Sequence, residues 1–180
     1  MRPFSAPLIV LDTETTGFPS DRWSRVIEIA AVRLDEYGEI VNSFSRVVRP
    51  DILDGRADKA LEINRISREE IAAADPTEQV AEAFEAWAGD YWTTAYNVAW
   101  ASCVMERAMA DMGPAGVLRD ANRNHPRYSP DRPWLWPSLK AAAEFYQVPQ
   151  TEPAHRATSD ALTAAHIACM IRRRELAAAA

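Results

Sequence analysis

Four consecutive apolar residues, 8–11, run directly into the acidic segment Asp12-Thr13-Glu14 near the N-terminus. A short, continuous apolar run predicts a strand that is buried on both faces. Because side chains alternate along a strand, Asp12 and Glu14 point to the same side, about 7 Å apart. Two carboxylates so placed repel each other, and the arrangement is costly unless a cation lies between them. The pattern therefore favours a fold that leaves the carboxyl end of a buried strand open to an ion.

The cation that such a pair would hold is a hard one, Mg²⁺ or Mn²⁺, because the ligands are carboxylate oxygens. An ordinary alternative is that Asp12 and Glu14 are two solvated acids beside a turn, and the Asp-x-Glu spacing alone does not exclude it. The context favours the ion. The pair leads into Thr15, Thr16 and Gly17, and a glycine lets the backbone approach a ligand closely.

A second segment with site chemistry lies near the C-terminus, where residues 154–160 read Ala-His-Arg-Ala-Thr-Ser-Asp. Thr158 is the predicted N-cap of a helix over residues 158–176. This places Asp160 in the first turn, where the helix dipole keeps it ionised. An imidazole titrates near neutral pH, which suits His155, on the loop before the helix, to take a proton from water. The alternative for a lone loop histidine is a structural role.

Taken together, these two segments suit two-metal hydrolysis of a phosphodiester, in which one ion activates water and the other stabilises the leaving oxygen. The remaining periodicity predicts an α/β domain with a mixed sheet. Residues 113–137 carry five prolines and read as a long loop that could hold a short strand. Strands are expected at residues 8–11, 26–34, 40–48 and 91–96, and helices after a capping box at Ser67, from residue 75 to Gly89, and at 100–112, 138–146 and 158–176.

The chain has 180 residues and a formal net charge of −6. The length fits one domain. The charge weighs against a nonspecific duplex binder, which needs a basic face to displace counterions, but not against an enzyme that grips phosphates through metal ions. No apolar run approaches the ~18 residues that cross a bilayer, and residues 1–7 do not form a secretory signal. Cys103 and Cys169 are expected to be buried thiols of a cytoplasmic protein.

Three segments resemble the motifs of the DEDDh 3′–5′ exonuclease superfamily, which includes the proofreading epsilon subunit of polymerase III, oligoribonuclease and RNase T. Residues 8–17 match the first motif closely, residues 96–101 the second in part, and residues 155–160 the third. Residues 25–29 resemble the family's second strand, and residues 136–140 the start of its penultimate helix. The resemblance covers nearly the whole chain. It implies a ribonuclease H-like exonuclease fold, with a five-stranded mixed sheet flanked by helices and its first three strands antiparallel, in one domain over residues 1–180.

The resemblance further implies an enzyme that removes nucleotides from the 3′ end of single-stranded DNA or RNA and releases nucleoside 5′-monophosphates. Its intact site would use two Mg²⁺ or Mn²⁺ ions, with Asp12, Glu14 and Asp160 as metal ligands and His155 as general base. A homodimer and a polymerase partner are both compatible with the resemblance. The residues expected to contact the terminal nucleotide are Thr13, Thr15, Thr16, Gly17, Phe18, Asn97 and Trp100. Core packing is the alternative for Phe18 and Trp100, and a role in holding the loop is the alternative for Asn97.

The second motif departs from the family pattern His-Asn-x-x-Phe-Asp, because residues 96–101 read Tyr-Asn-Val-Ala-Trp-Ala. Ala101 stands where the resemblance places the fourth acidic residue, so we expect an inactivated variant that holds one ion well and the second weakly. The alternative is a noncatalytic module of the same fold that binds a 3′ end or a protein. An aspartic protease is excluded, because Glu14 occupies the position at which that chemistry needs glycine. The sequence is compatible with both DNA and RNA as substrates. It is also compatible with Ala101 as a deliberate substitution or as a natural loss of the acid.

Overall fold

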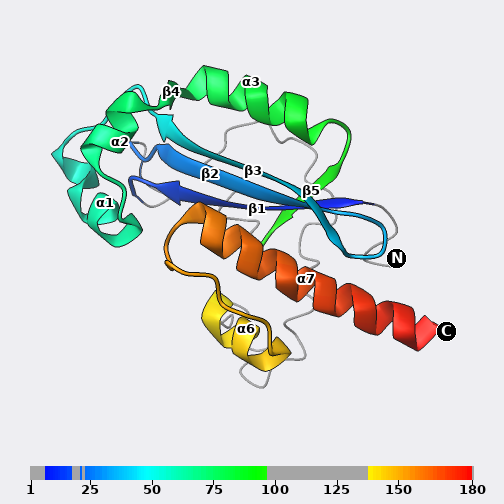
Figure 1. Cartoon of the computed structure of the whole chain (residues 1–180). Coiled ribbons are helices and arrows are strands. Elements are labelled where there is room, and N and C mark those ends of the chain that lie inside the picture. The colour runs from blue at the N-terminus through cyan, green and yellow to red at the C-terminus, as the bar shows by residue number, and fades with distance from the viewer. Residues whose placement is uncertain (1–6, 18–20, 22, 97–137, 180) are drawn as a thin grey trace.

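A central sheet with strand order β4-β3-β2-β1-β5 organises the computed structural model (Figure 1). The structure describes residues 7–17, 21, 23–96 and 138–179. Within them, the strands are β1 (Leu8–Thr15), β2 (Val26–Leu34), β3 (Ile40–Arg49), β4 (Asp75–Pro76) and β5 (Trp92–Ala95). The helical elements are η1 (Gly55–Ala57), α1 (Asp58–Asn64), α2 (Arg68–Ala73), α3 (Thr77–Ala88), α6 (Leu139–Tyr146) and α7 (Ala157–Ala179).

The strands β1, β2 and β3 form an antiparallel meander, as the sequence predicts. Strand β5 pairs in parallel with β1, and β4 pairs in parallel with β3, so the sheet is mixed. The two-residue strand β4 corrects the expectation that Asp75 and Pro76 open a helix. These residues pair with Val48 and Arg49 instead, because a proline at a sheet edge needs no N–H for the ladder. Helix α3 then begins at Thr77.

Alternation along β1 divides its side chains between the two faces of the sheet. Val10 joins the core under α6 and α7, and Leu11 joins the core under α3. Helices therefore cover both faces, as predicted (Figure 1). The strand continues past its apolar run to Thr15. Asp12 and Glu14 thus lie within β1, on the same face as Val10, and point toward the side of the sheet that α7 covers.

The segment from η1 to α2 packs on a third, smaller core that includes Ile27 of β2. Within it, Ser67 and Glu70 form the predicted capping box, in which each side chain accepts a hydrogen bond from the backbone N–H of the other residue. The buried amide of Asn64, at the end of α1, donates to the carbonyl of Thr15 at 3.4 Å. This bond ties α1 to the carboxyl end of β1, where the acidic residues lie.

The C-terminal helices follow the sequence closely. Ser138 caps α6, its hydroxyl accepting from the N–H of Ala141, and α7 packs along β1 and β2 over the core that α6 shares. Among the described helices, none is both long and apolar enough to cross a membrane. The helix expected at residues 100–112 and the loop expected at 113–137 lie outside the described residues.

Candidate metal centre

Three carboxylates from two distant parts of the chain converge at the carboxyl end of β1. Asp12, Glu14 and Asp160 each present an oxygen within 4.8 Å of the oxygens of the other two. Asp12 and Glu14 come from β1, and Asp160 comes from the first turn of α7. This spacing lies well inside the roughly 8 Å that a pair of bridging ions allows. Three half-buried oxygen ligands so close together fit a hard divalent cation.

Each of the three groups holds its proton more tightly than usual in the metal-free protein. Burial, followed by the charges of Glu14 and Asp160, raises the pKa of Asp12 well above its ordinary range. Burial and the charge of Asp160 raise the pKa of Glu14 to about 8. Burial also raises the pKa of Asp160, and the nearby His155 partly offsets this. A divalent cation would take the place of these protons, because it satisfies all three charges at once.

The turn that follows β1 is fixed by hydrogen bonds to residues 24 and 25. The N–H of Thr16 donates to the carbonyl of Arg25 at 2.9 Å, and the N–H of Arg25 donates to the Thr16 hydroxyl at 2.8 Å. The hydroxyls of Thr15 and Ser24 both donate to the carbonyl of Gly17, at 2.8 and 2.9 Å. The backbone beside the carboxylates is therefore set in one conformation by its own contacts.

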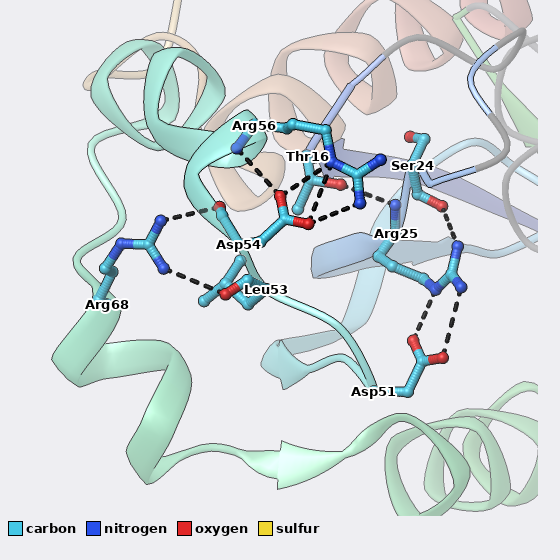
Figure 2. Close-up of polar contacts among 8 residues, drawn as sticks. All are labelled: Thr16, Ser24, Arg25, Asp51, Leu53, Asp54, Arg56 and Arg68. Atoms are coloured by element: carbon cyan, nitrogen blue, oxygen red, sulfur yellow. Dashed lines mark hydrogen bonds and ion pairs between the residues drawn. The ribbon is translucent and has the colours of Figure 1, made fainter.

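A second layer of polar contacts holds this turn from outside (Figure 2). The guanidinium of Arg25 binds both carboxylate oxygens of Asp51, at 2.6 and 3.3 Å. Arg56, which pairs with Asp54, lies over the ring of Trp23 at 5.1 Å. That ring lies against Gly17, where an added Cβ would come within 2.6 Å of it. A Cβ at position 17 would therefore force the Trp23 ring or the turn to move.

The start of α7 differs from the prediction in one respect. Thr158 is not the N-cap, because the helix already begins at Ala157 and the Thr158 hydroxyl bonds that of Ser45 at 2.7 Å. The N–H of Ala157 donates instead to the carboxylate of Glu28 on β2, at 2.8 Å. Asp160 still falls in the first turn, as predicted.

His155 lies just before the helix, as the sequence predicts, with an exposed side chain and a left-handed backbone at φ 61°. Its backbone N–H donates to the Asp160 carboxylate. The side chain of Thr13 faces away from the three carboxylates, because it alternates with Asp12 and Glu14 along β1. Its buried hydroxyl has no partner among the described residues. Phe18, Asn97, Trp100 and Ala101 lie outside the described residues.

Two residues near the centre were not identified from the sequence, Glu28 and Arg156. The guanidinium of Arg156 binds both carboxylate oxygens of Glu28, at 2.8 to 3.1 Å. The available signal was a charged residue inside the apolar strand at residues 26–34, because a buried charge needs a partner.

The sequence matches the RNase T family, described as exonuclease, over residues 9–168. It is 30% identical over 105 residues to a DNA polymerase III of the PolC type from Halalkalibacterium halodurans. That match covers 58% of this chain and 7% of the polymerase, so the chain spans a small fraction of that relative.

Solved structures share the fold. Exonuclease X in complex with 5′-overhanging duplex DNA is 28% identical, with a TM-score of 0.64 and 91% of each chain covered. The nuclease domain of 3′hExo, a DEDDh family member bound to rAMP, is 19% identical with a TM-score of 0.74; the match covers 94% of this chain and 92% of that one. The five-stranded mixed sheet with flanking helices is therefore the ribonuclease H-like exonuclease fold that the sequence predicts.

Proposed function

The chain belongs to the RNase T exonuclease family within the DEDDh superfamily, and on that premise we propose that it is built as a metal-dependent 3′–5′ exonuclease. The reaction is hydrolysis of the terminal phosphodiester of single-stranded DNA or RNA, with release of a nucleoside 5′-monophosphate. The observation that carries the proposal is the convergence of Asp12, Glu14 and Asp160 within 4.8 Å beside the turn after β1.

Asp12, Glu14 and Asp160 would hold Mg²⁺ or Mn²⁺. Such an ion would polarise the scissile phosphate and lower the pKa of a bound water. His155 takes the proton from the attacking water. His155 lies on the loop just before α7 with an exposed side chain, and its backbone N–H donates a hydrogen bond to the Asp160 carboxylate. Such proton transfer contributes about 10²–10⁴-fold to a rate.

The turn at Thr15, Thr16 and Gly17 binds the terminal nucleoside in this proposal. Support comes from its place directly after the acidic pair and from the four hydrogen bonds that fix it. A preformed backbone surface loses little conformational freedom when a nucleotide binds, which improves the positioning of the reacting phosphate.

Ala101 leaves this chain one acid short of the family set. We propose that the three remaining carboxylates hold one ion and that the second binds weakly. A weakly bound second ion would give the leaving oxygen several kcal/mol less stabilisation, and each 1.36 kcal/mol is about tenfold in rate. Turnover is therefore expected to be ~10³-fold or more below that of the Ala101→Asp variant.

The decisive experiment compares the parent with Ala101→Asp on 3′-labelled and 5′-labelled single strands of DNA and RNA, with Mg²⁺ and with Mn²⁺. A strong gain of activity that releases the 3′ label as a 5′-monophosphate supports the proposal. The control is Asp160→Asn added to Ala101→Asp, which should abolish that activity and so exclude a contaminating nuclease. No gain with either metal on either polymer contradicts it.

The second candidate is a noncatalytic module of the same fold that binds a 3′ end or a protein, and Ala101 is the observation that favours it. The polymerase relative supports a polymerase as such a partner. A module of this kind needs no response to Mn²⁺, so a calorimetric titration of the parent with Mn²⁺ separates the two functions.

A further inference from the structure

Glu28 is a buried carboxylate one strand away from the metal centre. It lies opposite Glu14 in the antiparallel pair of β1 and β2, on the face that α7 covers. Its side chain is 3% exposed. Like charges directly opposite each other destabilise a sheet, and a buried charge must be paired. Glu28 therefore needs a partner that Glu14 cannot supply.

That partner is the start of α7. One carboxylate oxygen of Glu28 accepts from the N–H of Ala157 at 2.8 Å, and both oxygens accept from the guanidinium of Arg156. The guanidinium also lies 3.8 Å from the carboxylate of Glu70 on α2. Glu28 thus caps the helix with a negative charge at its positive end and binds the residue just before it.

These contacts fix the positions of Asp160, in the first turn of α7, and of His155, on the loop before it. Asp160 is in the same helical turn, because its N–H donates to the carbonyl of Arg156 at 3.0 Å. His155 is bonded directly to Arg156 in the chain. Movement of Arg156 would therefore move both Asp160 and His155 relative to Asp12.

We propose that Glu28 is a positioning residue, which sets the Asp160 carboxylate and the His155 ring against β1 through Arg156 and the first N–H of α7. The inference rests on the proposed function. Glu28 acts through these groups and is not itself a ligand, since its own oxygens are occupied by Arg156 and Ala157.

The test uses the full chain and Mn²⁺ as the probe. Glu28→Ala should weaken Mn²⁺ binding about 10–100-fold, the usual effect of losing an outer partner of a ligand. Glu28→Gln keeps the size and the acceptor for Ala157 while losing the ion pair, so it should weaken binding less. In the Ala101→Asp background, both should lower kcat more than they raise KM.

The matched control is Glu39→Ala. Glu39 also pairs with an arginine of α7, Arg173, at 2.9 Å, but at an exposed position on the hairpin between β2 and β3. It should leave Mn²⁺ affinity unchanged, with circular dichroism used to show that each variant is folded. If Glu28→Ala unfolds the chain, Glu28→Gln decides.

Parent-like Mn²⁺ affinity in a folded Glu28 variant would overturn the inference, as would an equal loss in Glu39→Ala. Failure of the parent itself to bind Mn²⁺ would overturn the proposed function instead. Failure of the inference is thus seen in the Glu28 variants, and failure of the proposed function is seen in the parent.

Discussion

Glu14 and Glu28 are directly opposite each other on β1 and β2, yet they face different partners. Glu28 is matched within the protein by Arg156 and the first N–H of α7. Glu14 converges with two further carboxylates instead. Of two acidic side chains opposite each other on neighbouring strands, one is thus paired within the protein, and the other lies in the cluster that we propose binds a cation.

Replacing the proposed base should slow the reaction without weakening metal binding. In the Ala101→Asp background, His155→Ala should lower kcat by about 10²–10⁴-fold, and added imidazole should restore part of the rate. Mn²⁺ affinity, measured by calorimetry, should stay nearly unchanged. A collapse of Mn²⁺ affinity would make His155 a ligand rather than a base.

Removing one of the proposed ligands should instead weaken metal binding directly. Asp12→Asn should weaken Mn²⁺ binding by more than the about 10–100-fold that loss of an outer partner costs, because Asp12 is one of the three proposed ligands. The control is Asp75→Asn, an exposed acid at the sheet edge, which should bind Mn²⁺ like the parent. Equal affinity in the two variants would place the ion elsewhere.

The metal-free protein should lose stability as the pH rises. The pKa of Glu14 is raised from 4.5 to about 8 in the fold. Between these values the folded state keeps a proton that the unfolded chain has released, so the free energy of unfolding falls with increasing pH across this window.

Glu14→Gln removes this penalty. In EDTA at pH 8, urea denaturation should show it about 1–3 kcal/mol more stable than the parent, less than the full shift implies because the group is partly exposed. The difference should vanish near pH 4, and Mg²⁺ should restore the parent at pH 8. An exposed control on α6, Glu144→Gln, should show no such dependence; an unchanged difference from pH 4 to 8 in Glu14→Gln would contradict the assignment.

Gly17→Ala should destabilise the turn after β1. The new Cβ would come within 2.6 Å of the Trp23 ring, and overpacking of this kind costs about 1–3 kcal/mol. Adding Trp23→Leu should recover part of the loss, so the two changes should be non-additive in a double-mutant cycle. Additivity within about 0.5 kcal/mol would show that the two residues do not touch in solution.

Most strands and the acidic pair could be predicted from local sequence signals, whereas the five-strand count and the antiparallel pairing of the first three strands were implied by the family resemblance. The apolar run at residues 8–11 and the alternation at 26–34 each predict a strand from only a few residues. Strand β4 could not be found in this way, since two residues show no period. The prediction of Thr158 as the cap of α7 was wrong for another reason. Thr158 is a good local candidate, but the actual acceptor, Glu28, is distant in the chain.

The cap of α7 also joins two parts of the chain that are far apart in sequence. Glu28 and the N–H of Ala157 are 129 residues apart, and so long a closure costs entropy before any contact compensates for it. Asp12 and Glu14 share one strand and need no such closure to lie near each other. Asp160 joins them only when α7 is docked on the sheet. The carboxylate cluster is therefore complete only in the fully packed domain, because it depends on a contact of high sequence separation.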